Sequence, residues 1–151
     1  MKLLHAARCS LIAALCLVAT GVVAPEMAQA QQTIVVRNDI GGLIQSRANK
    51  VSQMRATGQR VEILGTCLSS CTMYLGAGNV CISPNARFGF HGPSSYGRRL
   101  VPQDFERWSN VIASHFKPEL QQWFMTTARH RINGFYRISG RQLIQLGYAS
   151  C

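Results

Sequence analysis

The amino-acid sequence predicts one domain of the α/β class with a largely parallel sheet. Short β-branched runs alternate with segments whose apolar residues recur at helical spacing, which is the order typical of parallel sheets. Glycine, proline and asparagine separate these segments, as they do in turns. Residues 31–151 are enough for one small hydrophobic core and too few for two.

The first predicted unit is a strand, a helix and a second strand. The β-branched run Thr33–Arg37 ends at a Gly-rich turn, which closes a strand. Apolar residues then recur at helical spacing from Leu43 to Met54, and Gly58 ends that helix. The apolar run Val61–Leu64 predicts the next strand.

The middle of the chain continues the alternation with shorter elements. After a turn rich in cysteine and serine, Thr72–Ala77 predicts a helix of small residues, which Gly78 ends. Two short strands are predicted at Val80–Ile82 and Arg87–Phe90, on either side of a Ser-Pro-Asn turn. The polar stretch Gly92–Gln103 is predicted to be a loop.

The last third of the chain is predicted to be helical. Apolar spacing from Asp104 onwards indicates a helix that Pro118 interrupts, and a second helix begins near Leu120. Ser139 can cap a short final helix, which Gly147 terminates.

The N-terminus has the three zones of a secretory signal. Two basic residues are followed by the apolar run Leu11–Val23 and then by the small-x-small site Ala28-Gln29-Ala30. The sequence therefore predicts a signal peptide at residues 1–30 and a domain at residues 31–151. It also predicts a periplasmic or secreted protein with no integral membrane segment after processing.

The charge of the chain is strongly basic but not localised. The full sequence has 16 basic and 6 acidic residues, and without residues 1–30 there are 14 basic and 5 acidic residues, a net charge of +9. A nucleic-acid surface needs clustered basic residues with interleaved aromatics, whereas these arginines are scattered through every predicted element. We therefore expect a basic solvated surface and no nucleic-acid partner.

Four cysteines remain beyond the predicted signal: Cys67, Cys71, Cys81 and Cys151. In an oxidising compartment they are expected to form two disulfides, with three possible connectivities. No histidine completes the spacing of a zinc site and no nucleotide-binding loop is present, so we expect neither a metal nor another cofactor.

A strand that runs through a tight turn into a helix can present a nucleophile at the helix N-terminus. There, free backbone amides and the helix dipole favour developing negative charge. Ser69 or Ser70 is placed for this role, and His91 lies at the end of a later strand, where it could accept the proton. A serine at a helix N-terminus is also common as a purely structural cap.

Three blocks of sequence, in the same order, resemble the Clp-type serine peptidases and a group of predicted periplasmic proteins similar to them. The family has a Ser-Pro-Gly-Gly turn, an Ala-Ala-Ser or Cys-Ala-Ser-Ala-Cys turn and a Pro-Asn-x-Arg-x-x-x-His strand, which are similar to Asp39–Gly42, Cys67–Cys71 and Pro84–His91. Phe105–Phe124 is similar to the family's long handle helix, and Ile138–Tyr148 is similar to the family's closing segment.

The resemblance implies a ClpP/crotonase-like spiral of strand-strand-helix units, abbreviated at the N-terminus, and assembly into a homo-oligomer. It also implies a peptide or small acyl substrate and a set of site residues. Carried over residue by residue, these are the nucleophile Ser69, the base His91, and the amides of Gly41 or Gly42 and of Ser70 as the oxyanion hole.

One feature of the family is absent, because no acidic residue follows Glu119 and the usual third catalytic residue is an aspartate near the closing segment. Asn133 is the candidate in that stretch to orient His91 through its amide, although an amide cannot offset the charge of an imidazolium. Two hypotheses follow: a serine hydrolase with a Ser-His dyad, and a non-catalytic oligomeric binding or scaffold protein of the same fold.

Overall fold

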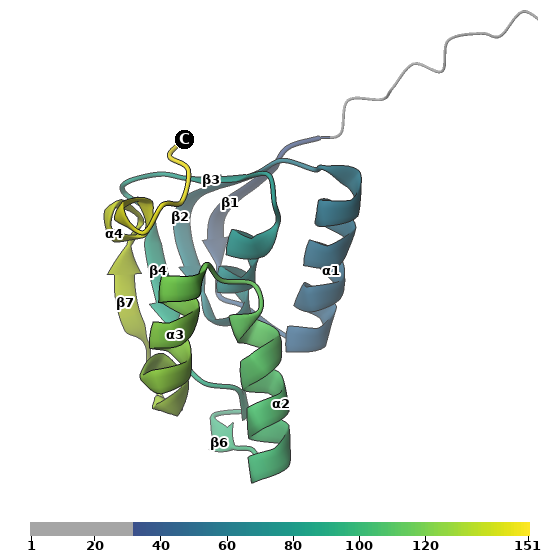
Figure 1. The fold of residues 1–151 in the computed structure, drawn as a ribbon, viewed down its shortest axis with the longest axis vertical. Coiled ribbons are helices and arrows are strands. Elements are labelled where there is room, and N and C mark those ends of the chain that lie inside the picture. Colours follow the sequence, from purple (N-terminus) through teal and green to yellow (C-terminus); the bar gives the residue numbers. More distant parts are fainter. Residues whose placement is uncertain (1–31) are drawn as a thin grey trace, which may run out of the picture.

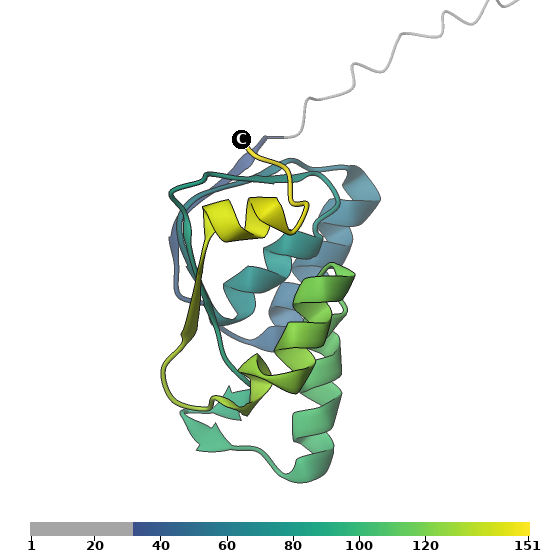
Figure 2. The ribbon, with the colours of Figure 1, turned by 60° about the vertical axis from the view of Figure 1, so that its left-hand side comes forward.

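The computed structural model describes residues 32–151, so the predicted signal peptide lies outside the described residues. The described chain is a mixed α/β structure in which one sheet is covered on one face by helices (Figure 1). Turned by 60°, the same molecule shows the helices together on one side of the sheet (Figure 2).

The sheet has five strands: β1 (Ile34–Asp39), β2 (Val61–Leu68), β3 (Val80–Ile82), β4 (Arg87–Phe90) and β7 (Tyr136–Ser139). The order is β1-β2-β4-β7, and β3 pairs with the first half of β2. β2 is parallel to β1, β3 and β4, as the sequence predicts, whereas β7 is antiparallel to β4 and makes the sheet mixed.

The helices are α1 (Ile44–Thr57), η1 (Ser69–Gly76), α2 (Pro102–Ala113), α3 (Pro118–Thr126), η2 (Ala128–His130) and α4 (Gly140–Gln145). A small hairpin of β5 (Ser94–Ser95) and β6 (Arg98–Arg99) lies in the stretch predicted to be a loop. No helix within residues 32–151 combines the length and the apolar character needed to cross a bilayer.

Local sequence explains where several helices begin and end. α1 ends at Gly58, whose φ of 68° is the left-handed conformation that glycine adopts readily. Ser139 and Gln142 form a capping box at the start of α4. The stretch similar to a long handle helix is two helices, because Pro118 begins α3 and its missing N–H cannot continue α2.

The core lies between the sheet and the helices, and η1 runs through it. Phe88 and Phe90 of β4 are buried against the helices, and Phe90 packs edge-to-face on Phe116 and Trp123. All side chains from Ser70 to Leu75 in η1 are buried. The turn that precedes η1 is therefore held in place by the core.

The four cysteines form two disulfides, which settles the connectivity that the sequence left open. Cys67 bonds to Cys71 across the start of η1, and Cys81 bonds to Cys151, which is 70 positions further along the chain. The second disulfide links β3 to the last residue of the chain, where the amide of Cys151 also donates to the carbonyl of Ile82.

The Cys81–Cys151 disulfide is expected to be the more stabilising of the two. Serine at both positions should lower the free energy of unfolding by about 4 kcal/mol, because the unfolded chain then regains the entropy of a long loop. The matched double variant Cys67→Ser/Cys71→Ser should lose only about 2 kcal/mol, because its loop is short. Denaturant titration of the three oxidised proteins measures both values, and equal losses would contradict the loop-entropy argument.

Candidate active site

Ser69 is the first residue of η1 and follows β2 directly, in a strained conformation. Its φ is 57°, in the left-handed region that residues other than glycine rarely adopt. Such a conformation costs about 1–2 kcal/mol and persists only where the surroundings hold it. This backbone conformation directs the side chain of Ser69 away from the line of the strand, and the residue is partly exposed at the N-terminus of η1.

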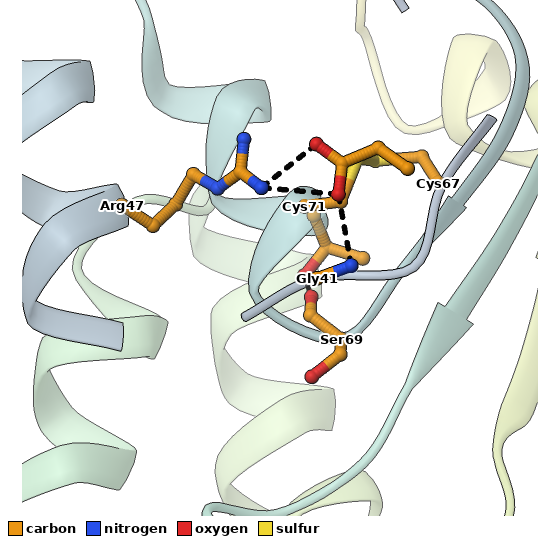
Figure 3. The surroundings of a disulfide bond; sticks show 7 residues. Gly41, Arg47, Cys67, Ser69 and Cys71 are labelled. Atoms are coloured by element: carbon orange, nitrogen blue, oxygen red, sulfur yellow. Dashed lines mark hydrogen bonds and ion pairs between the residues drawn. A yellow bond between two sulfur atoms is a disulfide. The ribbon is translucent and has the colours of Figure 1, made fainter. Parts of the chain in front are cut away.

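Three contacts hold this turn. The disulfide between Cys67 and Cys71 spans it, with both side chains fully buried (Figure 3). The hydroxyl of Thr72 donates to the carbonyl of Ser69 at 2.7 Å. On the open side, a side chain at Gly41 would place its Cβ 2.6 Å from Cβ of Ser69, so only glycine allows the two backbones to approach so closely.

Ser69 forms a hydrogen bond with His91. The distance between Oγ of Ser69 and Nε2 of His91 is 2.7 Å, within the range in which a base can take a hydroxyl proton. The two residues follow β2 and β4, which are adjacent and parallel, with Leu68 opposite Gly89. The register therefore brings the carboxyl ends of both strands to the same end of the sheet, which is where ligands bind in open α/β sheets.

Burial makes His91 suited to act as a base. Removal from solvent lowers the pKa of His91 below its ordinary value of 6.5, and the backbone of Gly92 acts in the opposite direction. A lowered pKa keeps the imidazole neutral at neutral pH. For Nε2 to accept a proton from Ser69, the neutral ring must carry its hydrogen on Nδ1.

The side of His91 that faces away from Ser69 has no side-chain partner within residues 32–151, and its polar neighbour there is the backbone of Gly92, which favours the charged ring without a well-aligned hydrogen bond. Nδ1 is buried without a hydrogen bond to any of the described residues. The ring of Phe135 packs edge-on against the imidazole, with 5.2 Å between the ring centroids. Gly89 leaves room for this contact, because a Cβ there would lie 3.0 Å from the Phe135 ring.

The structure does not bring Asn133 to His91. Asn133 is exposed, and its side-chain oxygen lies beside Gly97 in the β5–β6 hairpin. Gly134 follows with a φ of 72°, and the chain then turns Phe135, rather than the asparagine, towards the imidazole. The predicted orienting role of Asn133 therefore has no geometric support, and the arrangement is a dyad.

The predicted oxyanion donors are not equivalent. The amide of Gly41 donates to Oδ1 of Asp39 at 2.8 Å and is therefore already engaged. Gly42 and Ser70 line the cavity at Ser69, and Ser70 lies in the first turn of η1, where amides have no acceptor within the helix. Of the three candidates, Gly42 and Ser70 are therefore the two whose backbone amides are free to donate to a substrate oxygen.

An ion pair that no local sequence pattern indicates holds the glycine turn. Asp39 accepts from Arg47 at 2.7 Å while it also accepts from Gly41 (Figure 3). The guanidinium of Arg47 also stacks 4.2 Å from the centre of the Tyr74 ring. Both charged side chains are mostly buried. Arg47 is eight residues after Asp39, so only the turn into α1 brings them together.

Two helix N-termini meet at the site. α1 begins directly after Gly42 and Leu43, and η1 begins at Ser69. Neither has a side-chain cap or an acidic residue in its first turn. Their partial positive charges are therefore not neutralised locally, which favours an anion or a developing oxyanion near Ser69.

Two adjoining cavities at the site offer room for a substrate. A small cavity of about 90 Å³ contains Ser69 and His91. It shares Gly42 with a larger groove of about 540 Å³, whose walls include the apolar residues Ile44, Leu100 and Trp108. No charged side chain lines that groove, so it suits an uncharged, largely apolar group.

No family model matches the chain, and the curated proteins searched contain no match to it. The likeness to Clp-type peptidases therefore rests on the sequence segments described above. Within residues 32–151, no three histidine, cysteine or carboxylate side chains gather closely enough to hold a metal ion.

Proposed function

We propose that this chain is a serine hydrolase that cleaves peptide bonds or small acyl substrates with a Ser69–His91 dyad. The observation that carries the proposal is the 2.7 Å hydrogen bond between the hydroxyl of a strained serine and Nε2 of a partly buried histidine. A hydroxyl at a helix N-terminus, beside a neutral base and unengaged amides, is the arrangement that acyl transfer requires.

The reaction follows from the positions of these groups. Oγ of Ser69 attacks the substrate carbonyl carbon while Nε2 of His91 takes the hydroxyl proton, and the amides of Gly42 and Ser70 bind the oxyanion. The imidazolium then protonates the leaving nitrogen or oxygen, which leaves an ester on Ser69. Water, deprotonated by His91, hydrolyses this ester and restores the hydroxyl and the neutral imidazole.

The substrate class follows from the cavities. The small cavity accommodates the reacting carbonyl, and the uncharged groove beside Trp108 accepts an apolar acyl chain or side chain. The two disulfides support a location outside the cytoplasm, either periplasmic or secreted. Assembly into a homo-oligomer and the ClpP/crotonase-like spiral remain parts of the proposal, the latter supported by the parallel β1-α1-β2 crossover.

A non-catalytic binding protein of the same fold is the second candidate. The observation that favours it is the unpartnered Nδ1 of His91, because loss of the orienting carboxylate in a serine triad costs about 10⁴ in rate. Such a protein would retain the cavity and the disulfide but would not form a covalent bond with a substrate.

Covalent labelling distinguishes the two candidates. The oxidised full-length chain is treated with a fluorophosphonate, and the modified peptide is identified by mass spectrometry. Modification of Ser69 is expected, because its hydroxyl bonds to Nε2 of His91 at 2.7 Å beside unengaged amides. Ser114 also lies near an imidazole, that of His115, but its hydroxyl donates to the carbonyl of Val111. Folded protein that remains unmodified would favour the binding protein and overturn the hydrolase proposal.

The labelling rate is expected to depend on pH through His91. Burial lowers the pKa of His91 below 6.5, so the neutral base predominates at pH 6.5 and above. As the pH falls through that lowered pKa, the imidazole becomes protonated and the rate should decline about tenfold per pH unit. Initial rates measured from acidic to mildly alkaline pH give the midpoint, and a midpoint above 6.5 would contradict a buried, neutral base.

A further inference from the structure

Four exposed apolar side chains lie in residues 40–43 and 94–101, the two segments that contribute Gly42 and Ser94 to the cavity of Ser69 and His91. They are Ile40, Leu43, Tyr96 and Val101, with exposed fractions of 73, 80, 103 and 64%. In the described part of the chain, the one other large apolar side chain with comparable exposure is Val35, at 44%. Exposed apolar residues that cluster in this way usually mark a binding surface.

The four residues belong to two segments that lie next to each other. Leu43 lines the same 540 Å³ groove as Ser94 and Leu100, so the turn before α1 and the segment around the β5–β6 hairpin meet there. Figures 1 and 2 both show the hairpin and the start of α2 at the bottom of the molecule, with the start of α1 directed toward the same end. We call the surface formed by the apolar residues Ile40, Leu43, Tyr96 and Val101 the apolar rim, and we include in it the two arginines that lie between Tyr96 and Val101 in the chain, Arg98 and Arg99.

Tyr96 is held in an unfavourable conformation without contacts that would offset it. Tyr96 and Gly97 connect β5 to β6 with φ values of 49° and 73°, which is a two-residue hairpin turn that favours asparagine followed by glycine. A bulky residue with positive φ is an outlier, and this ring is fully exposed. An exposed aromatic kept at a strained position indicates a role in contact with a partner.

The charges beside the rim are positive. Arg98 and Arg99 are exposed on β6, and neither is in a salt bridge within residues 32–151. Asp104, in the first turn of α2, is the acidic residue that follows the rim in the chain. Of the other nearby carboxylates, Asp39 is already paired with Arg47, so the rim carries an excess of positive charge.

We propose that the apolar rim docks onto the surface of an anionic lipid bilayer. Tyrosine is enriched where protein meets the headgroup region, and apolar side chains with adjacent arginines are the usual composition of surfaces that lie in this interface. A second copy of the chain is a poorer occupant, because a two-fold contact through the rim would bring Arg98 and Arg99 of both copies, unpaired in the described chain, into one interface. The proposal does not depend on hydrolase activity.

The first test is sedimentation of the full-length chain with vesicles of phosphatidylglycerol mixed with phosphatidylcholine. Binding is expected at low salt, with loss at high salt and little binding to phosphatidylcholine alone. The double variant Arg98→Gln/Arg99→Gln should bind about 30-fold more weakly. The matched control Arg87→Gln/Arg137→Gln removes two exposed arginines from β4 and β7, on the sheet, and should bind as the wild type does.

A substitution at Tyr96 separates binding from folding. Tyr96→Asn places the favoured residue in the hairpin turn, so thermal stability is expected to hold or rise while vesicle affinity falls severalfold. Loss of affinity together with loss of fold would instead point to a structural role for the ring. Equal affinity of wild type and Tyr96→Asn would overturn the proposal.

Hydrogen exchange locates the contact. Residues 1–30 contain their own apolar run, so a local measurement is needed in the full-length chain. Vesicles are expected to protect the backbone amides of residues 40–43 and 94–101. If protection of these segments instead rises with protein concentration in the absence of lipid, the rim binds a second copy and the lipid proposal is wrong. Protection that vesicles cause only in other segments would also overturn the proposal.

Discussion

Ser69→Ala is expected to abolish fluorophosphonate labelling of the oxidised protein. The reagent bonds to a serine oxygen when a base removes the hydroxyl proton, and the hydroxyl of Ser69 lies 2.7 Å from Nε2 of His91. Alanine at this position keeps the positive φ and the Cys67–Cys71 disulfide, so the fold should be retained. Mass spectrometry of intact protein measures the labelled fraction.

Ser70→Ala is the matched control for this experiment. Ser70 is the next residue, its hydroxyl is buried without a hydrogen-bond partner, and only its backbone amide is assigned to the oxyanion. Its labelling should therefore stay close to that of the wild type. If Ser70→Ala abolished labelling and Ser69→Ala did not, the assignment of the nucleophile would be wrong.

His91→Ala is expected to slow labelling by about 10²–10⁴-fold, the usual contribution of a general base. Ser69 would keep the strained turn and the two helix N-termini, but its hydroxyl would have no acceptor for its proton. The measurement is the initial rate of labelling at a pH where the wild-type rate is constant. A small residual rate is expected from the remaining electrostatic stabilisation.

His130→Ala provides the comparison for His91→Ala. His130 ends η2 and is exposed, with its ring 6.3 Å from that of Phe105 and with no hydrogen bond to Ser69. Its removal should leave the labelling rate unchanged. An unchanged rate in His91→Ala as well would mean that the 2.7 Å contact is structural, and it would favour the binding-protein alternative.

The sequence predicted the elements whose signals are local. β3 and β4 have the predicted bounds. The end of α1 at Gly58 is also as predicted, because a glycine that follows a helical pattern is a local signal for a left-handed C-cap. β7 was missed because Tyr136–Ser139 becomes a strand only by pairing with β4, far away in the chain. The β5–β6 hairpin was missed because Tyr96 replaces the asparagine that marks such turns.

The candidate site was likewise predictable where its signals are local and not where it depends on long-range contacts. The blocks around Ser69, His91 and Gly42 indicated groups that the structure brings to one cavity. The pairing of Asp39 with Arg47 and the packing of Phe135 on His91 depend on how the segments fold onto one another, and no local spacing indicates them. η1 also begins at Ser69 rather than at Thr72, because the disulfide at its start draws the chain into the helical turn earlier.

The connectivity of the two disulfides bears on how the chain acquires them. In chain order, the first cysteine of the domain bonds to the second and the third bonds to the fourth. A chain oxidised as it emerges from a translocation pore, N-terminus first, would reach this pairing by joining each new cysteine to the last free one. Oxidative maturation should therefore proceed with a thiol oxidant alone and be little affected by loss of a disulfide isomerase.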